Sequence, residues 1–230
     1  VSRLLASDDD AYTNGSDVYF KFLQVVNNDR DANQEFLVIE FNALVLNVIG
    51  NQSNTALTND FQLFINGSLN ATSPLITARV AEPSFTLTKT ITVAPQDAGD
   101  PLVYRLTITN NSSGNNASAG FDLHITDTLN AFLVLDGVTV TVPGYATFTD
   151  ASAAPNVDVI ISRINPGDVA YVDIAAHVGP LVPNGQIIPN AAHLTFTGLP
   201  GTGTCPNPTG SCTPGSSGAA NGERNGETAP

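Results

Sequence analysis

Phe85-Thr-Leu-Thr-Lys-Thr-Ile-Thr-Val93 is the most strictly alternating stretch of the chain, with threonine at every even position. Successive side chains of a β-strand point to opposite faces of the sheet, so one face here would carry only threonine. Short runs rich in Val, Ile, Leu, Thr and Phe recur along the sequence between Gly, Pro, Asn and Asp, and no stretch shows helical spacing of apolar residues. The pattern predicts an all-β protein with antiparallel sheets packed as a sandwich.

The alternating runs also indicate how the chain is organised. We expect strands near residues 18–26, 36–48, 57–65, 85–93, 102–109, 121–127, 132–142, 157–163, 168–178 and 190–197. The segments from Glu35 to Phe61 and from Asp168 to Ala192 share one order: an acid, an apolar strand, a turn, then an Asn before a final strand. Tandem sandwich repeats are therefore expected. Residues 1–80 would be the second half of an upstream repeat, incomplete or completed by a neighbour, and residues 81–200 one complete repeat.

Residues 201–230 are rich in Gly, Ser, Pro, Asn and Thr, which predicts a loop or linker. Cys205 and Cys212 enclose a short polar stretch in this segment, and that setting favours a disulfide over a metal or redox site. Free thiols are the alternative. Because the chain starts at Val1 and contains no Met, we expect a processed chain or a segment of a longer one.

The composition fits a folded extracellular protein. Of its 230 residues 42% are hydrophobic, enough for one or two sandwich cores. The net charge of -13 disfavours binding to nucleic acid and to anionic membrane surfaces. No apolar run approaches the roughly 20 residues that a spanning helix needs. We expect no nucleic-acid partner and no membrane insertion.

Strand parity places three polar residues on faces that are otherwise apolar. Lys89 shares its face with the apolar residues of the stretch 85–93, and Asp127 shares its face with those of 121–129. Asn190 begins the inward row of 190–196. A buried, unpaired charge is costly, but together the three side chains can react. Burial favours a neutral, nucleophilic lysine and a protonated aspartate, so the amine could attack the Asn190 side chain and expel ammonia.

Several motifs of residues 81–200 resemble the conserved-repeat domain of large bacterial surface proteins. They are Phe85-Thr-Leu-Thr-Lys89-Thr, Leu102-Val-Tyr-Arg-Leu-Thr-Ile-Thr-Asn110, Ile125-Thr-Asp127-Thr-Leu129, Asn165-Pro-Gly-Asp168 and Ile188-Pro-Asn190-Ala191-Ala192. That domain is similar to the CnaA-like modules of Gram-positive pilins and adhesins. The resemblance implies an immunoglobulin-like sandwich in which Lys89 donates the amine of an isopeptide bond, Asn190 accepts it and Asp127 is the catalytic acid. The alternatives are a hydrogen-bonded network of the three side chains, or a lysine that reaches water at the sheet rim.

Other candidate sites are weaker. Asp29, Asp31 and Glu35 form an oxygen-rich run that suits a calcium ion, and solvated acidic loops are the alternative. The three histidines lack the spacing of metal ligands, and we expect them to pack on the surface or across strands. No nucleophile elbow, phosphate loop or paired carboxylates stand out, so we do not expect an enzyme, and an extracellular hydrolase is the least favoured function.

Two functions are left open. The first is a structural repeat of a stalk, filament, sheath or surface layer, whose partners are other copies of itself or neighbouring repeats. The second is an adhesin that binds a glycan or a protein. Both place the chain outside the cell or at its surface.

Overall fold

The computed structural model describes residues 10–14, 17–41, 43, 45, 51, 53–114, 117–198, 200 and 225–230, with side chains left out for 10–14 and 225–227. The chain divides into two compact units, residues 1–43 and 44–230, which are treated separately below. Within the described ranges no helix is long and apolar enough to cross a membrane. The protein is all-β, as predicted, and its ordered core lies in the second unit.

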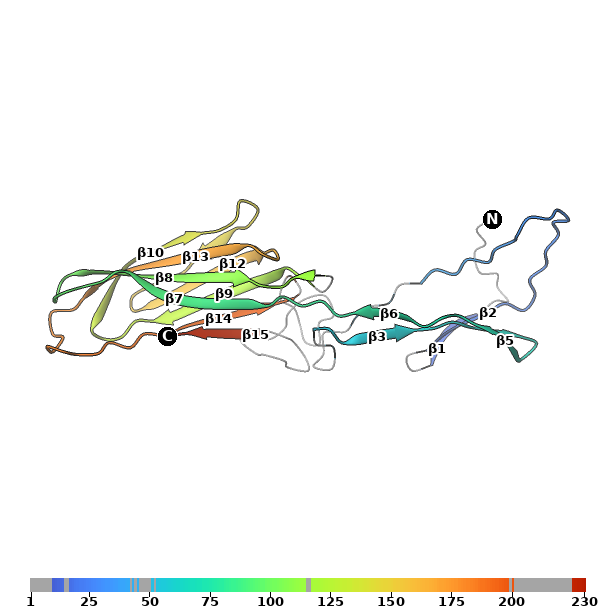
Figure 1. Cartoon of the computed structure of the whole chain (residues 1–230), viewed down its shortest axis with the longest axis horizontal. Coiled ribbons are helices and arrows are strands. Elements are labelled where there is room, and N and C mark those ends of the chain that lie inside the picture. Colours follow the sequence, from blue (N-terminus) through green and yellow to red (C-terminus); the bar gives the residue numbers. More distant parts are fainter. Residues whose placement is uncertain are drawn as a thin grey trace. The chain divides into compact units, whose positions relative to one another are not determined.

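The core is a sandwich of two antiparallel sheets (Figure 1). One sheet has the strand order β10-β13-β8-β7 and the other the order β11-β12-β9-β14-β15. The strands are β7 (Phe85–Val93), β8 (Pro101–Asn110), β9 (Gly120–Thr128), β10 (Leu133–Thr141), β11 (Phe148–Asp150), β12 (Asn156–Ile164), β13 (Val169–Val178), β14 (Ala192–Thr197) and β15 (Asn225–Ala229). This arrangement confirms the predicted antiparallel β-sandwich, which includes β15 as well as strands of residues 85–197.

Alternation of apolar side chains determines which face of each strand is buried. Leu106 and Ile108 of β8 and Leu123 and Ile125 of β9 are fully buried between the sheets. The buried apolar residues of the described chain lie between Phe85 and Phe196, together with Ala229. Burial of this apolar surface is the main stabilising contribution to such a sandwich.

Two predicted positions on β7 are wrong. Ile91 and Val93 were expected on the buried face with Lys89, but they are 54% and 42% exposed. The facing strand β14 begins at Ala192, and the register of β7 with β8 shifts between Ile91 and Val93. The inner face of β7 therefore loses its cover just beyond Lys89.

The described residues between 10 and 80 form only two-stranded sheets, which are smaller than the half sandwich predicted for this part of the chain. In the first unit β1 (Asp10–Asn14) pairs with β2 (Asp17–Lys21), and the ring centroids of Phe20 and Phe41 lie 5.9 Å apart. The strand expected over 36–48 is absent from residues 36–41, 43 and 45, the part of it that the structure describes. The counterpart segment that begins at Asp168 does contain a strand, β13. The two segments therefore differ in structure where the repeat predicts a match, and tandem repetition stays a prediction.

A two-stranded ribbon follows in residues 54–80. It combines β3 (Ala56–Asn59) with β6 (Ile76–Arg79) and β4 (Gln62–Ile65) with β5 (Ser68–Thr72). Asn66 and Gly67, both with positive φ, form the tight turn between β4 and β5. Apolar side chains of the ribbon such as Phe64 and Ile76 are exposed.

The C-terminal segment differs from its expected linker character. Residues 225–229 form β15, which pairs with β14 from Ala192↔Ala229 to Phe196↔Asn225. A strand therefore ends the stretch 201–230 that was predicted to be loop or linker throughout. Cys205 and Cys212 lie outside the described residues, so their disulfide stays a prediction.

Gly120 provides a test of how tightly the sandwich packs. A Cβ at this position would overlap the ring of Phe85, which is itself packed against Phe196 with ring centroids 4.7 Å apart. We predict that Gly120→Ala lowers the free energy of unfolding by about 1 to 3 kcal/mol, because a filled core does not accommodate an added methyl group. Urea denaturation measures the change.

Gly137→Ala is the matched control, because a Cβ there meets no atom within 4 Å. This variant should unfold within about 0.5 kcal/mol of wild type. Equal effects of the two substitutions would contradict the packing described at Gly120.

Candidate functional site

Lys89, Asp127 and Asn190 meet between the two sheets. Lys89 Nζ lies 2.7 Å from Asp127 Oδ2. Lys89 comes from β7 in one sheet, Asp127 from β9 in the other, and Asn190 directly precedes β14. The structure thus brings together the three residues that strand parity singled out.

The site is closed to water at its centre. The side chain of Lys89 is 1% exposed and that of Asp127 is 0% exposed. The alternative in which Lys89 extends to water at the sheet rim is therefore wrong. Asn190 is only half-buried, because it lies at the edge of the sandwich.

The Asn190 amide links the other two side chains of the site. Its Nδ2 donates to Asp127 Oδ1 at 2.8 Å, and its Oδ1 accepts from Lys89 Nζ at 2.6 Å. Both hydrogen bonds suit an ammonium on Lys89 and a carboxylate on Asp127.

Desolvation shifts both titratable groups toward their neutral forms. Burial lowers the pKa of Lys89, and this outweighs the hydrogen bond and the charge of Asp127, which act to raise it. Burial likewise raises the pKa of Asp127 against the opposing effects of Lys89. The Tyr104 ring, with its centroid 4.5 Å from Lys89 Nζ, attracts the ammonium and acts against the shift in the lysine. Buried charges are costly, so a neutral amine beside a protonated carboxyl becomes accessible.

A cavity of about 730 Å³ opens beside these residues. Asn190, Pro189 and Ile188 line it from the segment before β14, and Ile91 lines it from the end of β7. Pro230, which follows β15, is also part of its wall. The cavity connects the buried triad with solvent, and a small molecule released at Asn190 would have a way out.

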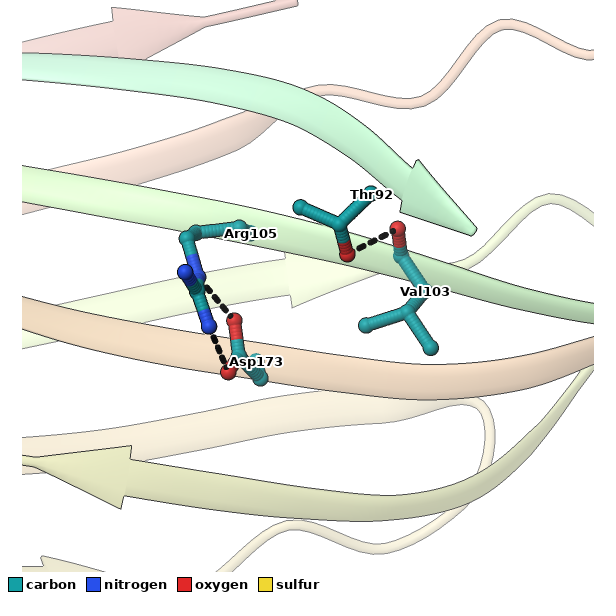
Figure 2. A network of polar contacts seen from close by, with 4 residues as sticks. All are labelled: Thr92, Val103, Arg105 and Asp173. Atoms are coloured by element: carbon teal, nitrogen blue, oxygen red, sulfur yellow. Dashed lines mark hydrogen bonds and ion pairs between the residues drawn. The ribbon is translucent and has the colours of Figure 1, made fainter. Parts of the chain in front are cut away.

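The outer face of the sheet that contains β7 carries a second ion pair. Arg105 donates from Nε and Nη2 to the two carboxylate oxygens of Asp173, both at 2.7 Å (Figure 2). The guanidinium also lies 5.3 Å from the centre of the Tyr171 ring. This pair is solvent-exposed, in contrast to the buried pair of Lys89 and Asp127 on the inner side.

The other sequence candidates are not part of the triad. Ligand atoms of Asp29, Asp31 and Glu35 fall within 4.8 Å of one another, but all three residues are exposed and the calcium site stays a prediction. His124 contacts Asp158 at 2.9 Å and His177 contacts Asp136 at 2.8 Å. His193 contacts Thr228 at 2.8 Å. The histidines thus have partners across strands, as expected.

The class defined by this fold and site is a two-sheet antiparallel sandwich with a lysine and an acid buried between its sheets and a half-buried asparagine beside them. No family model matches the sequence, and no curated protein matches it. The chain is similar to the major pilin subunit BcpA of Bacillus cereus at 13% identity and a TM-score of 0.44, over 75% of this chain and 46% of the pilin.

Further similar structures are the full-length major pilin SpaD of Corynebacterium diphtheriae and the collagen-binding domain of a Staphylococcus aureus adhesin. The first has 15% identity and a TM-score of 0.43, over 64% of this chain and 33% of SpaD. The second has 14% identity and a TM-score of 0.33, over 62% of this chain and 95% of the domain. The chain spans less than half the length of the two pilins. The similar structures are thus pilin subunits and an adhesin domain, the kinds of protein named by the resemblance of the sequence motifs.

The buried pair Lys89–Asp127 and the exposed pair Arg105–Asp173 allow a direct comparison of burial. We predict that Asp127→Ala lowers the free energy of unfolding by about 3 to 5 kcal/mol, because it leaves the Lys89 amine in the interior without its partner. Asp173→Ala should leave stability close to wild type, because Arg105 stays hydrated on the outer face. Equilibrium unfolding in urea checks both variants, and a mild effect of Asp127→Ala would contradict the burial of the triad.

Proposed function

We propose that the sandwich is a structural module of an extracellular surface protein, stabilised by an amide bond between the side chains of Lys89 and Asn190. The observation that carries the proposal is the contact of the half-buried Asn190 amide with a buried amine and a buried carboxyl. Lys89 Nζ lies 2.7 Å from Asp127 and 2.6 Å from the amide oxygen of Asn190. These separations suit reaction between neighbouring side chains.

The chemistry begins with proton transfer from the lysine ammonium to the Asp127 carboxylate. The Asn190 amide then turns about its Cβ–Cγ bond, so that its carbonyl oxygen accepts a hydrogen bond from the protonated Asp127. The neutral amine attacks Asn190 Cγ, and a bond forms between Nζ and Cγ.

Collapse of the tetrahedral intermediate breaks the bond between Cγ and Nδ2. The former lysine nitrogen loses one proton and the leaving amide nitrogen gains one, with Asp127 as the carrier. The products are a secondary amide and one molecule of ammonia, which the adjacent cavity can release. Asp127 ends in the protonation state in which it began the attack.

Such a bond would join the two sheets as well as distant parts of the sequence. Lys89 belongs to the β7 sheet, and Asn190 is held beside β9 and β14 of the other sheet. The closed loop would contain roughly 100 residues, for which the chain-entropy model gives a stabilisation of about 4 to 5 kcal/mol. A protein exposed to extracellular stress would gain strength without a larger core.

The wider role is that of a repeat in a stalk, filament, sheath or surface layer, with neighbouring repeats or other copies as partners. The exposed apolar side chains of residues 54–80 support the proposal that this ribbon belongs to an upstream module that other residues complete. An isolated two-stranded ribbon is only marginally stable in water.

Intact-mass spectrometry tests the cross-link. After reduction of any disulfide, folded wild-type chain should be lighter than its sequence by the mass of one ammonia molecule. Lys89→Arg, which keeps the charge, and Asn190→Ala should both show their full sequence masses. A folded wild-type protein with full sequence mass would refute the bond.

The same variants report on stability. We predict that Asn190→Ala unfolds with a free energy lower than wild type by about 4 kcal/mol, because its unfolded chain regains the entropy of the opened loop. The matched control is Asn184→Ala, which changes an exposed asparagine in the same connection before β14. Urea denaturation should separate the two variants clearly, and equal stabilities would count against a stabilising cross-link.

A further inference from the structure

We propose that the terminal strand β15 is a positioning element for the cross-link, with Ala229 closing the sandwich over Lys89, Asp127 and Asn190. This inference rests on the proposed function. It assigns a role to residues 225–230, which the sequence showed only as part of a polar segment.

The register of the second sheet places Ala229 in line with the acid of the triad. Val157 pairs with Asp127, Asp127 pairs with Ala192, and Ala192 pairs with Ala229. These four residues form one row across the sheet. Ala192 is 0% exposed and Ala229 is 2% exposed, so the row is buried both in its middle and at its β15 end.

The strand also borders the lysine. β15 contacts β7, the strand of the opposite sheet that carries Lys89. Pro230 lines the same cavity as Lys89 and Asn190. The terminal strand therefore lies at the side of the sandwich where the two reacting side chains meet, and its removal would uncover them.

Main-chain pairing with β14 holds β15 in this place. His193 Nδ1 also contacts Thr228 Oγ1 at 2.8 Å. The sequence Asn-Gly-Glu-Thr-Ala has low strand propensity, because Gly, Asn and Glu are depleted in strands. Burial of the Ala229 methyl group therefore contributes to the placement of the strand.

Docking of β15 affects the reaction through water. With the strand in place, desolvation favours the neutral amine and the protonated carboxyl that the attack requires. With the strand displaced, water reaches the triad, the charged pair regains hydration and the reactive state becomes rarer. The rate of amide formation then falls although all three reacting residues are present.

Cell-free synthesis of the full chain provides material in which the bond has not yet formed, and intact mass at successive times gives the rate of ammonia loss. We expect Ala229→Asp, which places a charge in the closed row, to slow this loss by about tenfold to a hundredfold. Ala151→Asp is the matched control, because it places the same charge at an exposed alanine next to β11, at the opposite edge of the sheet, and it should react at nearly the wild-type rate. Circular dichroism establishes that each variant is folded.

A separate peptide that supplies β15 to a truncated chain tests whether the strand acts by positioning the reacting residues or by a general effect on folding. A chain ending at residue 220 should react slowly, and a synthetic peptide of residues 221–230 should restore the rate in a concentration-dependent way. The same peptide carrying Ala229→Asp should not.

The outcomes distinguish the two proposals. If wild type loses ammonia and the truncated chain loses it equally fast, or gains nothing from the peptide, the role of β15 is refuted while the cross-link stands. If wild type keeps its full mass, the cross-link is refuted and the role of β15 with it.

Discussion

Placing the Lys89 and Asp127 side chains out of water is the constraint on which the rest of the site depends. A charged pair in the interior gains its mutual attraction but loses the hydration of both partners, and an apolar pair of equal size would often be more stable. Here the two groups are 1% and 0% exposed, one on each sheet. The sandwich thus keeps a costly arrangement in its core, and the proposed amide bond to the half-buried Asn190 would give that arrangement a chemical use.

The surrounding strands hold the three side chains in place. β9 is the central strand of its sheet, with β12 on one side and β14 on the other, so Asp127 has little freedom to move. β7 is an edge strand paired only with β8 in its sheet, and it presents Lys89 from the opposite side. Asn190 lies just before β14, where the chain enters the sheet. Each group is therefore positioned by a different strand, and the site exists only in the folded sandwich.

Much of this arrangement follows from period-two patterning. Parity alone placed Lys89, Asp127 and Asn190 on inward faces, because each lies among apolar residues at alternate positions. Parity does not state where the facing sheet ends, which is why Ile91 was expected inside and is exposed. β15 was missed for a different reason: its residues have low strand propensity, and its position depends on pairing with β14.

The placement of Lys89 and Asn190 has a mechanical consequence if they are joined. Tension applied at both ends of the module would reach Lys89 through the first strand and Asn190 through β15 and β14, and the amide would connect Lys89 and Asn190 directly. The strands between these two residues would then carry no load, so most of the module could stay folded while it transmits force. Without the bond, the same pull would have to be resisted by hydrogen bonds and side-chain packing, which separate one after another.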